Sequence, residues 1–536
     1  MRERSGGILR FCMRMLPVSL LSIALATTNG ASAESSSIAM AIAKIVTRPE
    51  LRNAIVSTEI YDLDAKRPLY VRNGAMLMEA ASTTKLVTTG TSLALLGPNF
   101  RWTTPVYRIG SVDPNGVLHG DIVLVASGDP NLSQRIRPDG TLAFENEDHS
   151  YGGTYDARAV PGDPLAVLRE LAAQVAKSGI KAIEGRVFVD TSLFVDQGPE
   201  AGTRAIVSPI VVNDNLIDVT VTPGTKPGDP VTIAVSPQTP YVTFLNKAKT
   251  SARRTEPTID FSDDTSNAEG SHTLTISGTQ PPGPPILFAY RVPEPQRFAQ
   301  AAFTLALADA GVRVTAAASA LAFNRPAAAV FYTAPNLVAR HVSPPLSEDV
   351  YITLKVSDNL HAALLPYMWA VYVAKAKSDL LKAGFARERA LLAAAGLDLS
   401  GASQRDGLGG SAFFTPDFMV RYLAWARTQR WFSKLRRGLP ILGVDGTLFN
   451  IQNGSPARGR AFAKTGTGIA LNLLGGDTLV SKGLAGFMTT SHGRHVAFAF
   501  YINRMAGTPN VDLSKDAAHY AGQILGEMAT DAYLSL

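Results

Sequence analysis

The sequence predicts an α/β multidomain protein. The two chain ends would form one domain, an antiparallel sheet flanked by helices, and two domains would be inserted between them, one α/β and one mostly β. Its 536 residues suffice for roughly three or four domains. Hydrophobic residues make up 46% and charged residues 18%, which excludes a disordered chain and allows large cores. Both ends mix strand and helix patterns, whereas the middle is mainly short strands and turns.

The first elements are a hairpin and a helix. Ile55 to Val71 alternates apolar and polar residues around the turn Asp64-Ala65-Lys66, which is typical of a β-hairpin. Ala80 to Leu96 has a helical pattern, with Ser82 predicted at its N-cap and Gly97-Pro98 at its end.

The middle of the chain first mixes strands and helices and then consists of strands. Two strand patterns, Gly120 to Ala126 and Gly185 to Asp190, enclose an amphipathic helix at Pro164 to Ser178. Val212 to Ser277 is rich in Thr, Pro and short strand runs, which indicates a small β domain. A helix pattern returns at Pro295 to Ala310.

After about Ser343 helices dominate, and two strands precede a last helix. The predicted helices and strands are His361 to Ala374, Pro416 to Gln429, Gly483 to Thr489, His495 to Asn503 and Lys515 to Tyr533. We therefore expect a first domain of residues 34–103 with 340–536, an inserted α/β domain of residues 104–205 with 291–339, and an inserted β-rich domain of residues 206–290.

Residues 1–33 have the layout of a secretory signal peptide, which predicts export to the periplasm. Four arginines precede the apolar run Met15 to Ala26, and Ala31-Ser32-Ala33 offers small residues for cleavage. The alternative is an uncleaved anchor, but the run is short for a membrane span. No later apolar stretch approaches about 18 residues, so we expect no integral membrane segment after cleavage.

Charge and cysteine content exclude several classes of function. The first 33 residues carry three of the six net positive charges, and the remaining charge is too weak to argue for nucleic acid. The one cysteine, Cys12, lies within the predicted signal peptide. Cleavage would therefore exclude disulfides, a cysteine nucleophile and cysteine-based metal sites.

Three short motifs carry the chemistry, in one order along the chain: Ser82-Thr83-Thr84-Lys85 (S-x-x-K), Ser357-Asp358-Asn359 (S-D-N) and Lys464-Thr465-Gly466 (K-T-G). Together they match the serine acyl-transfer set of penicillin-binding proteins and serine β-lactamases.

The spacing within the motifs has a physical reason. A serine needs an adjacent base, and Lys85, three residues after Ser82, projects from the same helix face. A lysine becomes a base only when its pKa falls, which we expect Lys464 to cause as a nearby cation. The K-T-G stretch suits an edge strand beside Ser82. There Gly466 would let substrate backbone approach, and the N–H groups of Ser82 and Thr467 could form an oxyanion hole.

Other candidate residues have structural interpretations. A second S-x-x-K, Ser178 to Lys181, follows a helix and is interpreted as a solvated turn. His492-Gly493-Arg494-His495 could suggest a metal pair, but a hairpin turn is favoured. His361, Trp369 and Tyr372 are interpreted as packed residues. We predict no cofactor and no metal.

With these motifs in place, the chain resembles the D-alanyl-D-alanine carboxypeptidase/endopeptidase family of low-molecular-mass class C penicillin-binding proteins (the penicillin-binding protein 4 type, peptidase family S13). Ser82 and Ser357 lie far apart, and this family has large domains inserted between those motifs. The resemblance extends from about Ile42 to Gly526, including Gly120 to Leu132 and Ala463 to Thr467.

The resemblance implies a penicillin-binding, transpeptidase-like fold and a role for each motif residue. Ser82 would be the acylated nucleophile, Lys85 its base, Ser357 a proton relay and Asn359 an orienting group, while Lys464 would assist catalysis and engage the substrate carboxylate. Substrate-binding positions would be Asp358, Thr465, Gly466 and Thr467. The implied partners are peptidoglycan stem peptides and cross-links, and β-lactam antibiotics as covalent inhibitors.

The chain departs from the family pattern at three places. Asp406-Gly407-Leu408-Gly409-Gly410 lacks a usual hydroxyl, Gly198 to Val207 lacks a usual tryptophan, and Thr467 to Lys482 is longer and richer in glycine. The alternatives to a peptidase are a β-lactamase or esterase on the same scaffold, and a non-catalytic wall-binding protein. An intact Lys85 argues against the last of these.

Overall fold

The two ends of the described chain meet in one five-stranded antiparallel sheet. Its order is β2 (Arg67–Arg72), β1 (Ile55–Asp62), β22 (His495–Ala506), β21 (Asp477–Thr489) and β20 (Ala461–Leu471). The computed structural model describes residues 36–267, 270–316, 325–471, 473, 477–506 and 513–536, so the predicted signal peptide lies outside the described residues. The K-T-G motif therefore lies on an edge strand, as the sequence predicted.

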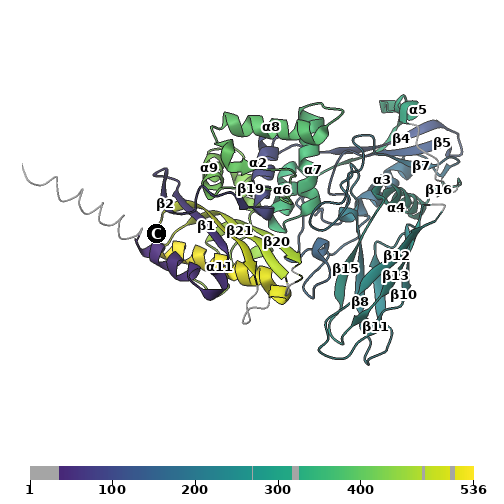
Figure 1. Ribbon diagram of the computed structural model, residues 1–536. Coiled ribbons are helices and arrows are strands. Elements are labelled where there is room, and N and C mark those ends of the chain that lie inside the picture. The colour runs from purple at the N-terminus through teal and green to yellow at the C-terminus, as the bar shows by residue number, and fades with distance from the viewer. Residues whose placement is uncertain (1–35, 268–269, 317–324, 472, 474–476, 507–512) are drawn as a thin grey trace, which may run out of the picture.

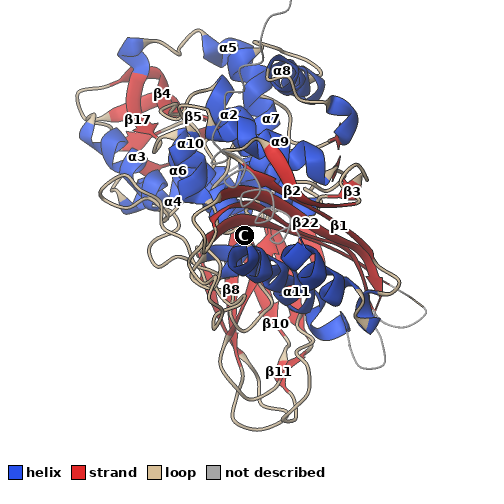
Figure 2. Cartoon of the chain, turned by 90° about the vertical axis from the view of Figure 1, so that its left-hand side faces the viewer, coloured by secondary structure: helices blue, strands red, loops and turns tan. Residues whose placement is uncertain are grey.

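Helices cover both faces of this sheet (Figures 1 and 2). On β22, Phe498, Phe500 and Ile502 face the helix over residues 36–46 and α11 (Leu513–Ser535), whereas Ala499 and Tyr501 face the opposite side. This follows from the two-residue period of a strand. The opposite face carries helices α2 (Lys85–Leu95), α6 (Leu346–Lys355), α7 (Asn359–Met368), α8 (Leu380–Ala394), α9 (Pro416–Arg427) and α10 (Phe432–Gly438).

A second, mixed sheet forms from the segments on either side of the strand-rich middle. Its order is β16 (Arg313–Val314), β6 (Ala182–Ile183), β5 (Val117–Val125), β4 (Thr103–Val112) and β17 (Leu337–Val342), and β7 (Val187–Asp190) also pairs with β5. Helices α3 (Ala166–Lys177) and α4 (Pro295–Asp309) share its apolar core. The short helix α5 (Arg325–Ala329) follows β16 along the chain.

The strand-rich middle forms three small sheets, at the lower right of Figure 1. They are β15 (Ile286–Arg291) with β8 (Leu216–Thr222) and β9 (Thr232–Ser236); β10 (Val242–Asn246) with β13 (His272–Ser277) and β12 (Asp260–Ser266); and β11 (Lys249–Thr250) with β14 (Thr279–Gln280). A separate small sheet joins β18 (Ala402–Ser403), β19 (Phe413–Phe414) and β3 (Met78–Glu79). The mixed α/β architecture with several sheets is confirmed.

Two details differ from the sequence prediction. The helix expected at His361 to Ala374 begins at Asn359, because the Asp358 carboxylate accepts the N–H of His361 and caps it. It changes to a π-helical turn at Trp369–Val373, shortly after Pro366, which has no N–H to donate.

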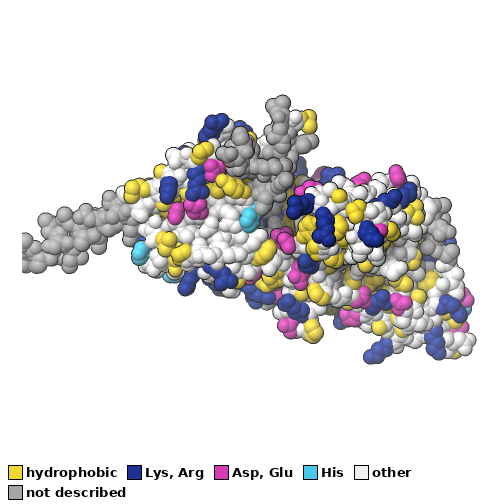
Figure 3. All heavy atoms as spheres, turned by 90° about the horizontal axis from the view of Figure 1, so that it is seen from below, with side chains coloured by type: hydrophobic (Ala, Val, Ile, Leu, Met, Phe, Trp, Pro, Cys, Tyr) yellow, Lys and Arg dark blue, Asp and Glu magenta, His cyan; other side chains and the backbone are white. Residues whose placement is uncertain are grey.

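The surface agrees with the small net charge of the sequence, and the described helices agree with the expected lack of an integral membrane segment. On the face shown in Figure 3, basic and acidic side chains are interspersed, and this face has no continuous basic patch. Among the described residues, no helix combines the length and apolar character that crossing a membrane requires.

Candidate active site

Ser82 lies in a tight turn directly before α2, not at a helical N-cap. The turn is the 3₁₀ segment Ala81–Thr84, and α2 begins only at Lys85. The predicted N-cap role of Ser82 is therefore wrong. Its hydroxyl accepts a hydrogen bond from Nζ of Lys85 at 3.0 Å, and this contact replaces the bond to a backbone N–H that a cap would make.

Lys85 is the centre of the site. Its fully buried amine contacts Ser82 Oγ, Ser357 Oγ at 3.1 Å, the Ser357 carbonyl at 2.7 Å and Oδ1 of Asn359. Burial lowers the pKa of Lys85 to about 8, against the opposing charges of Asp358, Glu200 and Asp406. The amine is thus within reach of the uncharged form that a base requires.

The S-D-N motif forms a sharp turn between α6 and α7. Ser357 has a left-handed backbone (φ 64°), which turns its carbonyl, its hydroxyl and the Asn359 amide oxygen toward Lys85. The buried carboxylate of Asp358 caps α7 beneath this turn. The turn therefore presents three oxygen atoms to one amine.

Lys464 and Gly466 of β20 lie against the Ser82 turn. Lys464 is fully buried, and burial together with the charges of Lys85 and Lys482 lowers its pKa well below the ordinary value. A Cβ on Gly466 would lie 2.6 Å from the Ala80 carbonyl oxygen and 3.2 Å from the Ser82 nitrogen, so only glycine allows this approach. All three motifs are thus brought together.

Thr465 and Thr467 bond to neighbouring side chains. The hydroxyls of Thr465 and Thr447 are 2.8 Å apart, and Nζ of Lys482 donates to Thr467 Oγ1 at 2.8 Å. A cavity of about 570 Å³ opens beside Thr465, with Lys482 and Glu147 in its wall.

Two loops where the chain departs from the family pattern also reach the site. Oδ1 of Asp406 accepts the N–H groups of Leu408, Gly409 and Gly410, and Gly409 (φ +99°) packs against the Ala81 carbonyl. In the other loop, Gly202 packs so closely against the Asn359 amide that a Cβ would lie 1.9 Å from it.

The sequence reasoning missed Tyr151, Glu200 and Asp406. The Tyr151 hydroxyl donates to the Ser357 carbonyl at 2.7 Å, across 206 residues of chain. Glu200 and Asp406 act on Lys85 through their charge. Glu200 and Asp406 lie in the two stretches, Gly198 to Val207 and Asp406 to Gly410, that the family resemblance had singled out, whereas nothing pointed to Tyr151.

The remaining candidates have the structural roles that the sequence analysis gave them, except that His361 is more than a packed residue. Ser178 bonds to the Val175 carbonyl at the end of α3, and residues 490–494 form the turn between β21 and β22. Trp369 and Tyr372 pack in the core and bond to Ser92 and Ser127. The exception is His361, which is buried as expected but belongs to a network of charges.

Comparisons with known proteins agree with this geometry. The model of the D-Ala-D-Ala carboxypeptidase 3 (S13) family matches residues 38–521. A D-alanyl-D-alanine carboxypeptidase of Actinomadura sp. (strain R39) is 26% identical over 502 residues, which is 89% of this chain and 85% of that protein. The D-alanyl-D-alanine carboxypeptidase DacB of Haemophilus influenzae is 24% identical over 463 residues, 80% of this chain and 81% of that protein.

Solved structures show the same fold. The crystal structure of penicillin binding protein 4 (dacB) from H. influenzae matches with a TM-score of 0.67 at 22% identity, covering 91% of this chain and 98% of that chain. The same protein complexed with a β-lactam matches with a TM-score of 0.66 at 21% identity, covering 92% and 99%.

Proposed function

Because this chain belongs to the D-Ala-D-Ala carboxypeptidase 3 (S13) family, we propose that it releases the terminal D-alanine of peptidoglycan stem peptides through an acyl-enzyme on Ser82. The observation that carries this proposal is the contact of the buried Lys85 amine with Ser82 Oγ, while the same amine contacts Ser357 and Asn359. Cleavage of D-Ala cross-links would use the same atoms.

The first half of the reaction is acylation. Ser82 Oγ attacks the carbonyl carbon of the penultimate D-Ala, and uncharged Lys85 accepts the hydroxyl proton. The oxyanion accepts hydrogen bonds from the backbone N–H groups of Ser82 and Thr467. When the peptide bond breaks, the leaving amine takes up a proton through the Ser357 hydroxyl, 3.1 Å from Lys85.

The second half returns the free enzyme. Water attacks the ester carbonyl, Lys85 accepts the water proton, and Ser82 Oγ leaves as a hydroxyl. Asn359 orients Lys85 through its amide oxygen. Lys464, Thr465 and Thr467 bind the terminal carboxylate of the substrate, and the negative charge of that carboxylate favours the charged form of Lys464, whose pKa is lowered while the site is empty. The peptide lies along the free edge of β20. Asp358 supports substrate binding through the Ser357–Asn359 turn, because its carboxylate caps the helix α7 that follows.

The domain organisation belongs to the same proposal. Residues 34–103 with 340–536 form the penicillin-binding domain, and residues 104–205 with 291–339 and residues 206–290 are inserted into it. The grouping of strands into separate sheets supports this division. Residues 1–33 direct export, and the enzyme acts in the periplasm.

The test uses penicillin and a pentapeptide ending in D-Ala-D-Ala. We expect wild-type protein to release D-Ala and to gain the mass of one penicillin, and Ser82→Ala to do neither. Ser178→Ala is the matched control, because Ser178 begins the second S-x-x-K and its hydroxyl bonds to the Val175 carbonyl of its own helix end. This variant should behave as wild type. Equal D-Ala release by wild type and Ser82→Ala would reject the proposal, and rapid penicillin turnover would favour a β-lactamase.

A further inference from the structure

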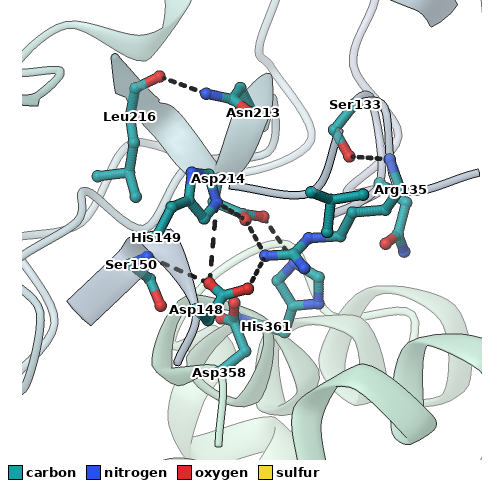
Figure 4. A network of polar contacts seen from close by, with 12 residues as sticks. Ser133, Arg135, Asp148, His149, Ser150, Asn213, Asp214, Leu216, Asp358 and His361 are labelled. Carbon is teal, nitrogen blue, oxygen red and sulfur yellow. Dashed lines mark hydrogen bonds and ion pairs between the residues drawn. The ribbon is translucent and has the colours of Figure 1, made fainter. Parts of the chain in front are cut away.

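A buried cluster of charged residues lies beside Asp358, the middle residue of the Ser357–Asn359 turn (Figure 4). We call Arg135, Asp148, His149, Asp214 and His361 the Asp214 cluster. Oδ2 of Asp214 accepts from Arg135 Nη2 at 2.8 Å and from His149 Nε2 at 2.7 Å, and its Oδ1 accepts from His361 Nε2 at 2.9 Å. Each member is at most 2% exposed. One carboxylate therefore joins three separate segments of the chain.

The backbone on both sides of this junction has an unfavourable conformation. Asn213, Asp214 and Asn215 are all left-handed (φ 49°, 56° and 53°), and so is Ser357 (φ 64°). Left-handed backbone is unfavourable for most residues other than glycine; Asn and Asp tolerate it best and Ser357 less well, and it persists where surrounding contacts impose it. The bonds of Asp214 to Arg135, His149 and His361 are contacts of this kind.

The cluster is ionised. Burial raises the pKa of Asp214, but Arg135, His149 and His361 outweigh this and hold the pKa well below its usual range. Burial lowers the pKa of His149 and of His361, but neighbouring carboxylates raise both well above the usual value. Arg135 also lies 2.7 Å from Asp148, so a fixed guanidinium occupies the position where these carboxylates could hold a metal ion.

Tyr151 connects the cluster to the catalytic lysine. It shares the short turn His149–Tyr151 with a cluster member, and its hydroxyl donates to the Ser357 carbonyl at 2.7 Å. The same carbonyl oxygen accepts from Lys85 Nζ, also at 2.7 Å. A carbonyl oxygen has two lone pairs, so it accepts both bonds.

The direction of the Lys85 lone pair depends on that carbonyl. An uncharged amine has two N–H bonds and one lone pair. The Ser357 carbonyl and Oδ1 of Asn359 can only accept, so they take the two N–H bonds. The lone pair then points toward the hydroxyls, including Ser82 Oγ at 3.0 Å. A displaced Ser357 carbonyl would turn the lone pair away from the nucleophile.

We propose that Tyr151, held in place by the Asp214 cluster, is a positioning residue that fixes the Ser357 carbonyl and thereby aims the Lys85 amine at Ser82. The inference rests on the proposed function, since it gives Tyr151 a task in acylation. It adds a residue outside the three motifs to the machinery of the reaction.

The experiment compares Tyr151→Phe with wild type, both as the mature protein without the signal peptide, with D-Ala release as the readout. The ring stays and only the hydroxyl is lost. We expect kcat to fall about tenfold with KM nearly unchanged, the effect of one hydrogen bond that positions a reacting group. Tyr155→Phe is the matched control, because Tyr155 lies in the same segment and is exposed. It should match wild type.

A second readout, the pH profile of kcat/KM, separates positioning from a merely structural role. Without the Tyr151 donor, the Ser357 carbonyl accepts more strongly from the Lys85 ammonium, which favours the charged form. The acid limb should therefore move to higher pH by about half a unit. The charged groups that face Lys85, namely Asp358, Glu200, Asp406 and Lys464, are unchanged in this variant.

Asp214→Asn is a second, independent variant that weakens the cluster holding Tyr151. If this variant folds, its kcat should also be lower than that of wild type. If it unfolds, Tyr151→Phe alone decides. A Tyr151→Phe enzyme with wild-type kcat and profile would overturn the inference, and so would a slower enzyme with an unshifted acid limb. Wild type and Ser82→Ala run alongside. Equal D-Ala release by these two rejects the proposed function itself, a result distinct from either outcome for Tyr151.

Discussion

The Lys85 amine has to be uncharged to accept a proton, and the protein favours that form by burying it. The sequence predicted the lowered pKa from the nearby cation Lys464. In the structure, burial is the largest cause, and three carboxylates oppose it. Sequence spacing could place Lys85 beside Ser82 but could not reveal its burial. The groups that enclose it come from residues 272 and 274 positions away, at Ser357 and Asn359.

The lowered pKa predicts a pH dependence. Below about pH 8 Lys85 is an ammonium and cannot accept the Ser82 proton, so acylation should slow tenfold per pH unit as the pH falls below that value. The measurement is the second-order rate of acylation by a fluorescent penicillin between pH 5 and pH 10, in steps of about half a unit.

Lys85→Arg is the control, since a guanidinium stays charged throughout this range and should give no acylation at any pH. An acylation rate that keeps rising up to the ordinary lysine pKa of 10.5, or one that does not change with pH, would contradict the assignment of Lys85 as the base.

The contact between β20 and the Ser82 turn shows which elements the sequence could specify. The hairpin and the edge strand with the K-T-G motif were predicted from local patterns and are confirmed. Gly466 was predicted to admit substrate backbone, and the structure adds a contact that was not predicted, with the Ser82 turn of the protein itself. The N-cap role of Ser82 was wrong. The S-x-x-K spacing is compatible both with Ser82 as the N-cap and with Ser82 in a 3₁₀ turn before the helix. The structure has the 3₁₀ turn, and the Ser82 hydroxyl bonds to Lys85 instead of to a backbone N–H.

This contact predicts different effects for two neighbouring glycines on β20. Gly466→Ala would place Cβ 2.6 Å from the Ala80 carbonyl, so β20 or the Ser82 turn must shift. Gly468→Ala meets no atom closer than 3.4 Å, which is ordinary contact. We expect Gly466→Ala to slow acylation about a hundredfold, because small displacements of reacting groups have effects of that order, and Gly468→Ala to slow it less than about threefold.

Acylation rates and circular dichroism of both variants would check this. Equal slowing in the two proteins would show that the approach of Gly466 to the Ser82 turn has no particular importance.

The Asp214 cluster links distant parts of the polypeptide, and sequence reasoning did not foresee it. Asp214 lies 79 residues from Arg135, 65 from His149 and 147 from His361. No motif or period relates these positions, and His361 was interpreted only as a packed residue. Local patterns encode elements and motif chemistry, whereas the buried contacts between separate segments arise only when the tertiary fold brings those segments together.

Because the cluster is ionised and buried, it should make the stability of the protein depend on pH in a defined direction. The pKa of His149 is higher in the folded protein than in the unfolded chain. Its contribution is therefore fully present below the ordinary value of 6.5 and is lost as the pH rises through the raised, folded value. Replacing His149 by Gln should lower the free energy of unfolding by about 3 kcal/mol at pH 6, since a buried charge loses its partner.

The difference between wild type and His149→Gln should then narrow steadily as the pH is raised, as measured by urea unfolding at pH 6, 8 and 10. His119→Gln is the matched control. His119 pairs with Glu184 on the surface, where ion pairs contribute little, so this variant should follow wild type at every pH. A difference for His149→Gln that widens with pH would mean that His149 is neutral in the folded protein. The cluster would then be held by neutral hydrogen bonds and not by paired charges.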